Sequence, residues 1–358
     1  MLLDFFKVST TPLIGVDISS SSIKVLQLSK ADDGKYRLDA YAVELLPVQA
    51  VVDKNIKASD KVGVVLRQAV KKIGSRRKFI AMAVAGASVV TRTIQINKEF
   101  NDNEIVEQIE IEADRYIPYP LEEVYYDFEI IGPSEKNPDL MDVLLAAARI
   151  ETVDMRIAVA EEAGLKATIV DVETLAMEKA FSLIAEHLPI KGPNSVIAMV
   201  DIGATTTTLY VFKNSKIIYS RDQAFGGRHL TDEIQRRYGL SVEEATAAQK
   251  YGGLPEDYTA EVLEPFKETI VQQVSRAIQV FFSSSEESEI HYIVLVGGIA
   301  ALPGVETLLQ NKMLIKTMVG NPFVDMQIDP SINKNVLAED APALMMTCGL
   351  ALRTFDSE

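Results

Sequence analysis

Two stretches of the chain repeat the same arrangement of an apolar strand, a short polar turn and a second strand. Asp17 ends the first strand of one copy, and Asp201 ends the first strand of the other, 184 positions further along. In both copies isoleucine follows the aspartate, and a turn of small or hydroxyl-bearing residues comes next, at 19–22 and 203–206. An internal repeat constrains architecture more than any single motif does. It predicts two related lobes that face one another.

Strands and helices alternate around each copy of the repeat. Strands are predicted at residues 13–18, 23–28, 36–44 and 79–84. A similar order restarts after Pro189 and Pro193, with strands predicted at 196–200 and 208–212. Strands mixed with helices in this way indicate an α/β protein with two lobes.

Two turns of this composition have the chemistry needed to bind a polyphosphate. Small residues let backbone N–H groups approach phosphate oxygens, and side-chain hydroxyls add further donors. One aspartate from each copy, Asp17 and Asp201, can hold Mg²⁺ through water, because that ion keeps much of its hydration shell. Lys24, in the strand after the first turn, offers a compact positive charge to a phosphate.

A third element, at residues 292–304, is a predicted buried strand followed by Gly297, Gly298 and the start of a helix. Glycine permits a positive φ and the close approach of a ligand. The glycine spacing differs from that of the dinucleotide-binding fingerprint, because the third glycine is missing. This turn indicates a ligand site only in combination with the two polar turns.

These three elements, in this order and spacing, resemble the actin-like ATPase superfamily of actin, Hsp70, sugar kinases, MreB and FtsA. The resemblance implies an α/β actin-like fold with two related lobes around a nucleotide cleft, at residues 1–190 and 191–358. It also implies an extra subdomain of the FtsA type at about 87–163 in the first lobe, and a helical subdomain at about 226–289 in the second. The implied ligand is ATP or ADP with Mg²⁺.

The resemblance further implies which residues serve the nucleotide. From the first lobe these would be Asp17, Ser19, Ser20, Ser21, Ser22 and Lys24. From the second lobe they would be Asp201, Gly203, Ala204, Thr205 and Thr206, with Gly226 and Gly227 near the sugar and Gly297 and Gly298 near the base and ribose. Asp17 and Asp201 would hold the metal ion. Glu173 would position the attacking water, although a carboxylate is also stabilised at a helix N-terminus without such a role. Whether ATP is hydrolysed or only held stays open.

Further stretches narrow the resemblance to the PilM family, the cytoplasmic actin-like components of type IV pilus assembly. The most specific is the Ile-Pro-Tyr-Pro-Leu-Glu-Glu stretch at residues 117–123, and others lie at 13–24, 200–212, 225–231 and 341–345. The resemblance implies an adaptor that docks the N-terminal cytoplasmic tail of PilN, a single-span membrane protein, and supports pilus biogenesis and twitching motility. It implies a cytoplasmic protein held at the inner membrane through this partner, with other platform or motor proteins and self-association as further interactions.

The charge of the chain is unevenly distributed. With 51 acidic and 36 basic side chains the net charge is −15, which argues against a nucleic-acid binder. Residues 97–129 alone hold eleven acidic side chains against Lys98 and Arg115, a local charge of −9. Residues 66–78 show the opposite pattern, with six basic side chains and no acidic one. An acidic groove beside the extra subdomain would favour an extended peptide whose basic residues flank a membrane span.

Composition restricts the compartment and excludes several kinds of site. A single cysteine, Cys348, excludes a disulfide framework and cysteine-based metal sites, and the three histidines are scattered along the chain. These counts fit a reducing cytoplasm. A membrane-spanning helix needs ~20 apolar residues, longer than any apolar run here. Leu2, Leu3, Phe5 and Phe6 are expected either to contact lipid or a partner, or to pack loosely on the domain.

Two other functional classes are weighed against the adaptor. A polymerising protein of the FtsA or MreB kind is the first, but FtsA relatives end in an amphipathic membrane helix, and this sequence ends soon after a closing helix predicted at 340–355. A small-molecule kinase of the same superfamily is the second. Such kinases usually carry a catalytic aspartate in the first lobe, and the nearest candidate is Asp171. Its place at the end of a predicted strand favours a structural role.

Overall fold

The computed structural model describes residues 12–135, 137–189, 192 and 194–356, without the side chains at 250 and 251. These residues group into two compact units. The first comprises the residues up to Ser29, Asp39–Ala176 and the residues from Gly349 onward. The second comprises Lys30–Leu38 and Met177–Cys348. The lobe and subdomain boundaries predicted from the sequence stay predictions.

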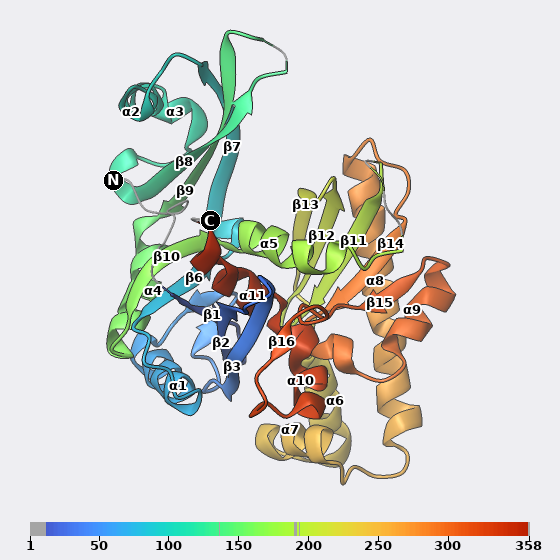
Figure 1. Ribbon diagram of the computed structural model, residues 1–358. Helices are drawn as coiled ribbons and strands as arrows, with labels where there is room; N and C mark the ends of the chain where they lie inside the picture. Colours follow the sequence, from blue (N-terminus) through green and yellow to red (C-terminus); the bar gives the residue numbers. More distant parts are fainter. Residues whose placement is uncertain (1–11, 136, 190–191, 193, 357–358) are drawn as a thin grey trace. The chain divides into compact units, whose positions relative to one another are not determined.

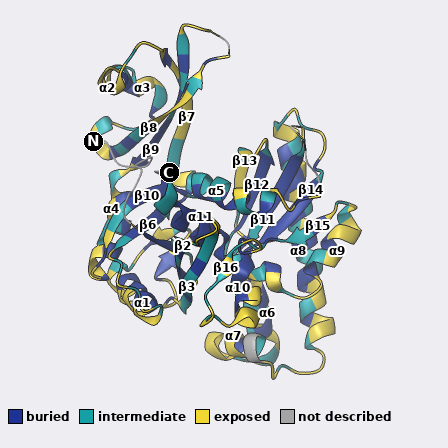
Figure 2. Cartoon of the chain, in the orientation of Figure 1, coloured by how far each residue is buried: buried dark blue, intermediate teal, exposed yellow. Residues whose placement is uncertain are grey.

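The first unit is built on a sheet with the strand order β10-β6-β1-β2-β3 (Figure 1). The strands are β1 (Ile14–Ile18), β2 (Ser22–Lys30), β3 (Tyr36–Leu45), β6 (Phe79–Val84) and β10 (Lys166–Val172), and the short strands β4 (Val51–Val52) and β5 (Asn55–Ile56) form a separate hairpin. β1 runs antiparallel to β2 and parallel to β6, and β6 runs parallel to β10. The central strands are coloured as buried in Figure 2, as expected for strands that are covered on both faces.

Two helices of the first unit, α1 (Ser59–Lys72) and α4 (Ile150–Glu162), pack against each other. Val62, Leu66 and Ala69 recur at helical spacing on α1 and are fully buried. The helices approach closely at Gly63, where an added Cβ would lie 2.5 Å from the Cβ of Glu162. α1 ends at Lys72, and Gly74, two residues later, has a φ of +63°, as is common just after a helix.

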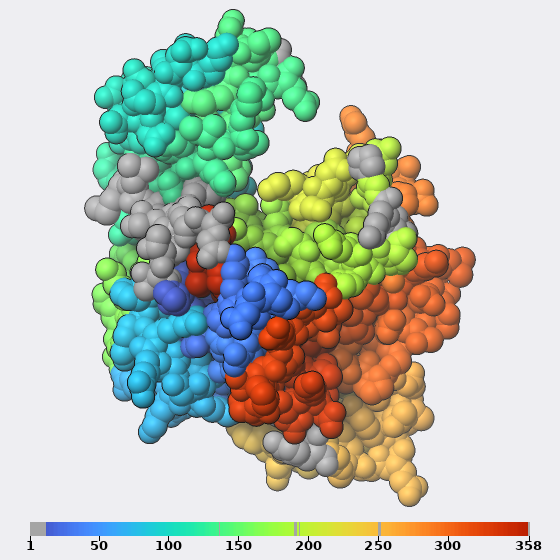
Figure 3. Space-filling view, in the orientation of Figure 1, coloured from blue at the N-terminus to red at the C-terminus, as the bar shows by residue number. Residues whose placement is uncertain are grey.

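An insertion between β6 and α4 carries its own sheet, in the order β7-β9-β8. Its elements are β7 (Val89–Asn97), α2 (Asp102–Ile111), α3 (Ala113–Tyr116), β8 (Val124–Pro133) and β9 (Leu140–Arg149). Ile105 and Ile109 of α2 are fully buried in a core shared with β9. In the space-filling view the insertion, coloured teal to green, is a continuous packed body (Figure 3). The helical segment of the insertion is divided at Glu112, because α2 ends before this residue and α3 begins after it.

The second unit repeats the sheet of the first. Its strand order is β13-β12-β11-β14-β15, with β11 (Val196–Ile202), β12 (Thr207–Lys213), β13 (Lys216–Gln223), β14 (Tyr292–Val296) and β15 (Thr317–Val319). β11 is antiparallel to β12 and parallel to β14, as β1 is to β2 and β6. Asp17 pairs with Lys24 in the first hairpin, and Asp201 pairs with Thr208 in the second, so the offset of 184 holds across the register. The repeat seen in the sequence is therefore confirmed.

Helices surround the second sheet and close its core. They are α6 (Arg228–Tyr238), α7 (Val242–Tyr251), α8 (Glu264–Ser284), α9 (Val305–Met313) and α10 (Lys334–Asp340). The long helix α8 buries Ile270, Val274 and Phe281 against the strands. α5 (Glu173–Ala185) and α11 (Met345–Leu352) each begin in one unit and end in the other. The short strand β16 (Gln327–Ile328) pairs with Arg37 and Leu38.

The closing helix predicted at 340–355 is wrong as a single element. The structure has α10, a 3₁₀ turn at Ala341–Leu344, α11 and a second 3₁₀ turn at Arg353–Phe355. Pro342 sits in the first 3₁₀ turn. Proline lacks the N–H that a continuous helix needs at this point, and it is tolerated in a first turn. The chain therefore starts a new helix after it.

Candidate functional site

The turn between β1 and β2 closes on itself through serine. The amide of Ser19 donates to the carbonyl of Ser22 at 3.0 Å, and the Ser19 hydroxyl donates to the same carbonyl at 2.9 Å. Lys24 is buried on the adjacent strand, and its Nζ donates to Asp17 Oδ2 at 2.7 Å. Ser20 and Ser21, the central residues of this turn, complete the predicted set of the first unit. The structure thus places the Lys24 ammonium on the Asp17 carboxylate, so the turn presents an ion pair.

The turn between β11 and β12 has the same construction. The amide of Gly203 donates to the carbonyl of Thr206 at 3.0 Å, the counterpart of the Ser19–Ser22 bond. Ala204 and Thr205 form the centre of the turn. The position equivalent to Lys24 is Thr208, whose Oγ1 donates to Asp222 at 2.7 Å. The second turn therefore carries no cation at this place, and the two halves of the repeat differ in charge although they share a fold.

Three further predicted glycines gather around the second turn. The amide of Gly227 donates to the carbonyl of Gly203 at 3.0 Å, and an added Cβ on Gly226 would lie 2.5 Å from the same carbonyl oxygen. Gly297 follows β14 with a φ of +86°, and its added Cβ would lie 2.4 Å from Asp201 Oδ1. At Gly226 the crowding atoms belong to the backbone, and at Gly297 they are the Asp201 carboxylate and the Ile202 backbone, so neither position has room for a Cβ. The structure brings the predicted residues of the second unit together.

Gly298 differs from its neighbour. It is exposed, its φ is not positive, and an added Cβ would have no heavy atom within 4 Å. The packing of the protein therefore does not require glycine at this position. Glycine beside a site of close backbone packing leaves room for a bound group, which fits the place that the sequence assigned to it near the base and ribose.

Lys54 pairs with Glu173 and Arg156 interacts with it electrostatically, and the sequence reasoning missed both basic residues. It begins α5, and its Oε2 accepts from Lys54 Nζ at 2.8 Å. Arg156 of α4 is buried, and its Nε and Nη1 donate to the carbonyls of Ala83 and Thr152. Burial lowers the pKa of Arg156, while the nearby carboxylates of Glu173 and Asp17 raise it. Arg156 therefore compensates two predicted site residues electrostatically.

Neither missed residue stands in a motif. Lys54 and Asp53 form the turn of the β4–β5 hairpin with φ values of +62° and +48°, and Arg156 looks like an ordinary polar residue of a helix. The turn signal was readable in the sequence, but the contact of Lys54 spans 119 positions.

Asp171 has a structural partner. It is fully buried at the end of β10, and its Oδ2 lies 3.3 Å from Nε of Arg353, which is 5% exposed. Arg353 also pairs with Asp356 at 2.9 Å. A buried carboxylate with an arginine partner is not available as a base for a substrate hydroxyl. The geometry agrees with the structural role expected from the sequence.

The predicted carboxylates suit a Mg²⁺ ion that keeps most of its waters better than a metal ion whose ligands are all protein side chains. Among the described residues, no three acidic, histidine or cysteine side chains gather as a metal site. Asp17 and Asp201 supply one carboxylate in each unit. Mg²⁺ characteristically binds one or two carboxylates together with waters and substrate phosphates, so either carboxylate taken by itself has the chemistry that this ion prefers.

A second candidate site is a groove of about 580 Å³ in the insertion. Its apolar lining comes from the end of α2, α3 and the turn after it, with Ile111, Ala113, Ile117, Pro118, Tyr119, Pro120 and Leu121. Glu110, Asp114 and Glu122 line it as well and are exposed. The Glu110 carboxylate accepts from the hydroxyl of buried Tyr126 at 2.7 Å, and burial with this bond raises the tyrosine pKa. The groove therefore combines an apolar surface with negative charge.

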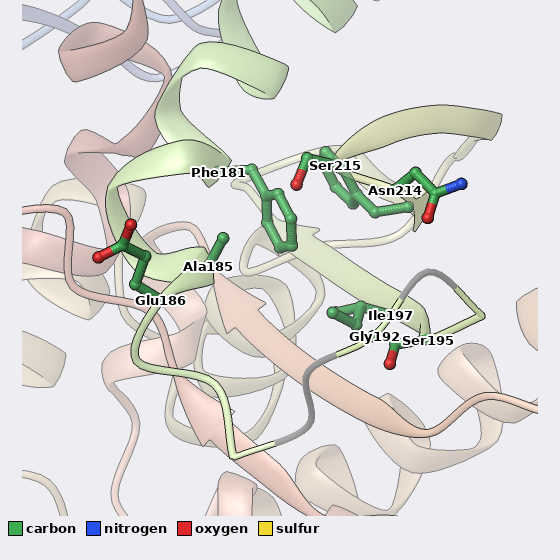
Figure 4. Close-up of a pocket in the computed structure, with 9 residues that line it drawn as sticks. Phe181, Ala185, Glu186, Gly192, Ser195, Ile197, Asn214 and Ser215 are labelled. Carbon is green, nitrogen blue, oxygen red and sulfur yellow. The ribbon is translucent and has the colours of Figure 1, made fainter.

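A separate pocket of about 480 Å³ lies in the second unit (Figure 4). It is lined by Phe181 and Phe212, whose rings stack with centroids 4.0 Å apart, and by Ser195, Asn214 and Ser215 among others. Glu186 is the charged residue of this lining, and none of the predicted nucleotide residues contributes to it. Among the described residues that line it there is no lysine or arginine to pair with a polyphosphate.

Comparison with known proteins agrees with this architecture. The structure of a PilM-PilN type IV pilus biogenesis complex is similar over 97% of this chain and 100% of that chain, with 25% identity and a TM-score of 0.75. The structure of MreB5 of Spiroplasma citri bound to AMPPNP is similar over 98% of this chain and 97% of the MreB5 chain. The identity is 13% and the TM-score is 0.50. These likenesses confirm the actin-like fold expected from the sequence.

Sequence comparison places the chain within this group. FtsA of Bacillus subtilis (strain 168) is 30% identical over 184 residues, which are 45% of this chain and 40% of FtsA, so the chain spans less than half of that relative.

Within the described residues, the structure has no helix long and apolar enough to cross a membrane. Leu2, Leu3, Phe5 and Phe6 lie outside the described residues.

The sequence profile of the family described as type IV pilus assembly protein PilM matches residues 15–355. The chain therefore belongs to the PilM family of type IV pilus assembly proteins.

Proposed function

We propose that this chain is a nucleotide-loaded adaptor of the type IV pilus inner-membrane platform, which docks the N-terminal cytoplasmic tail of PilN in the groove of the insertion. The observation that carries the proposal is the groove itself, which combines apolar side chains with exposed Glu110, Asp114 and Glu122. A tail that enters a membrane span carries basic residues on its cytoplasmic side, and these complement the groove. The likeness to a PilM-PilN complex over the whole of that chain supports the same partner.

The nucleotide part of the proposal rests on the two turns. Each is closed by an equivalent backbone hydrogen bond of 3.0 Å and follows an aspartate at the end of a strand. Backbone amides and hydroxyls of such turns suit phosphate oxygens. We assign Asp17 and Asp201 to hydrated Mg²⁺, Gly298 to the side of the ribose and base, and Glu173, held by Lys54, to a water molecule. The similar MreB5 structure was solved with AMPPNP.

An Asp201→Asn variant is expected to bind Mg-ATP about tenfold more weakly, because a carboxylate that acts through water contributes about that much to metal affinity. The measurement is titration calorimetry with ATP in the presence of Mg²⁺ and again in excess chelator, where the two proteins should differ little. Asp232→Asn, an exposed aspartate on α6 of the same unit, is the matched control. Equal affinity of Asp201→Asn and the unchanged protein for Mg-ATP would contradict the assignment.

Reversing two charges of the groove, Asp114→Lys together with Glu122→Lys, is expected to weaken binding of a PilN tail peptide by about tenfold. Exposed ion pairs contribute up to about 1 kcal/mol each, and reversal adds repulsion. Both residues are exposed and leave the Glu110–Tyr126 bond intact. Glu99→Lys with Glu129→Lys changes the net charge equally at exposed positions that do not line the groove. Equal loss in both double variants would show that only net charge matters.

Calorimetry with this peptide, with and without Mg-ATP, tests the adaptor as a whole. Binding in both conditions with different affinities is expected if the nucleotide controls docking. Equal binding would remove the control by nucleotide and keep the adaptor. Absence of binding in both conditions would overturn the docking of PilN.

A further inference from the structure

Exposed cations lie where two parallel strands of the first unit's sheet begin, and a further one lies at the end of α1. Lys78 directly precedes β6, Lys166 opens β10, and the Lys166 amide donates to the Lys78 carbonyl at 2.8 Å. Arg76 lies two residues before Lys78. Lys71 lies in the last turn of α1, which closes through a bond of 3.0 Å from the Gly74 amide to the Lys71 carbonyl. We call Lys71, Arg76, Lys78 and Lys166 the basic edge.

Arg77 lies between Arg76 and Lys78 and is directed into the protein. Its Nη1 donates to the carbonyl of Leu13 at 2.9 Å, and its Nη2 lies 3.6 Å from Asp39, with both side chains mostly buried. Alternate residues of an extended segment point to opposite sides. With Arg77 turned inward, its neighbours Arg76 and Lys78 point outward, and both are exposed.

Among the described residues, the basic edge differs from Lys72 and Arg67 in having no ion-pair partner for its charged groups. Lys72 pairs with Glu44 at 2.6 Å, and Arg67 pairs with Glu162 at 2.9 Å. In the part of the chain that the structure describes, no hydrogen bond or ion pair engages the charged groups of the basic edge. A helix C-terminus stabilises a cation such as Lys71, but Arg76, Lys78 and Lys166 lie outside helices. Contacts within the described part of the protein therefore do not explain why these four cations lie here.

We propose that the basic edge is a docking surface for an anionic lipid bilayer. Its cations come from the ends of three elements and from a loop, an arrangement that suits a diffuse, extended negative surface. Residues 66–78 contain no aromatic side chain, whereas binding of single-stranded nucleic acid combines cations with aromatic stacking. The net charge of −15 repels a bilayer from the remainder of the chain, so this edge would approach first. The proposal does not depend on the docking of PilN.

The test is sedimentation of the full chain with vesicles that contain no protein. Vesicles of phosphatidylglycerol mixed with phosphatidylcholine are compared with vesicles of phosphatidylcholine alone. Binding is expected only to the anionic vesicles and only at low salt, because the Debye length falls from about 30 Å at about 0.01 M salt to about 3 Å at about 1 M. Because PilN is absent, a negative result leaves its docking untouched.

Arg76→Gln with Lys78→Gln is expected to lower partition into anionic vesicles about 25-fold, since each cation near such a surface contributes about fivefold. Lys316→Gln with Lys334→Gln removes the same charge from exposed positions of the second unit and is expected to bind like the unchanged chain. Binding that survives at high salt, or equal loss in both double variants, would overturn the proposal. A further outcome is that the unchanged chain fails to bind anionic vesicles at low salt and still binds a polyglutamate peptide. That result would overturn the proposal and assign the basic edge to an acidic protein partner.

Discussion

A Gly297→Ala variant is expected to lose about 3 kcal/mol or more of unfolding free energy. The φ of +86° costs a residue with a side chain about 1–2 kcal/mol, and overpacking costs about 1–3 kcal/mol more. The overpacking is severe, because the new Cβ would lie 2.4 Å from Asp201 Oδ1 and 2.5 Å from the Ile202 carbonyl oxygen. The midpoint of the urea transition, followed by circular dichroism, measures the loss. Nucleotide binding should fall as well, because Asp201 has to move.

Gly298→Ala is the matched control for this experiment. It adds the same methyl group one residue later, with no heavy atom within 4 Å and no positive φ. We expect its urea midpoint to shift little, since a surface substitution usually changes stability by less than about 0.5 kcal/mol. Similar destabilisation of both variants would contradict the backbone packing described here. Weaker ATP binding by Gly298→Ala without loss of stability would support the place proposed for the nucleotide.

Replacing Arg353 with leucine is expected to lower the unfolding free energy by about 3–5 kcal/mol, because it leaves a buried carboxylate without its cation. Asp171 is fully buried, and Arg353 is 5% exposed. The midpoint of chemical denaturation is again the measurement. Lys98→Leu is the comparison, since its pair with Asp139 spans 3.5 Å with side chains 47% and 88% exposed, and such pairs contribute less than about 1 kcal/mol.

The double variant Asp171→Leu with Arg353→Leu separates lost charge pairing from lost packing. Removing both charges of a buried pair is often nearly neutral, so the double variant should recover much of the stability that Arg353→Leu loses. If the double variant is less stable than Arg353→Leu, Asp171 stabilises the fold through contacts other than this arginine. Its carboxylate also accepts from the Val172 amide at 2.7 Å, which is the alternative source.

The repeat was predictable because its signal is local. Each copy reads as strand, turn and strand within about a dozen residues, and the offset between Asp17 and Asp201 reappears in the register of both hairpins. The clustering of Gly226, Gly227 and Gly297 around the second turn could be expected once a family resemblance was at hand. The reason for Gly226 and Gly297, which is the absence of room for a Cβ, is visible only in the structure.

The sequence predictions differed from the structure where helix pattern, proline position and strand pairing favoured different arrangements. The periodicity of residues 340–355 favoured one helix, but Pro342 restarts the chain through a 3₁₀ turn. Lys24 was expected to face a phosphate, and that remains a prediction, but the structure pairs it with Asp17 across the hairpin. A strand pattern shows which residues lie opposite each other only when the register is known.

The sequence by itself determined that this chain has two related halves, that each carries an aspartate before a polar turn, and that it belongs with actin-like proteins of the PilM family. These properties depend on residues near one another in the chain. Among the described residues, tertiary structure left the basic edge without ion pairs and decided which other charges compensate each other, as with Lys54 and Glu173 or Asp171 and Arg353. Such pairings join residues up to 182 positions apart, so they depend on how the strands and helices pack.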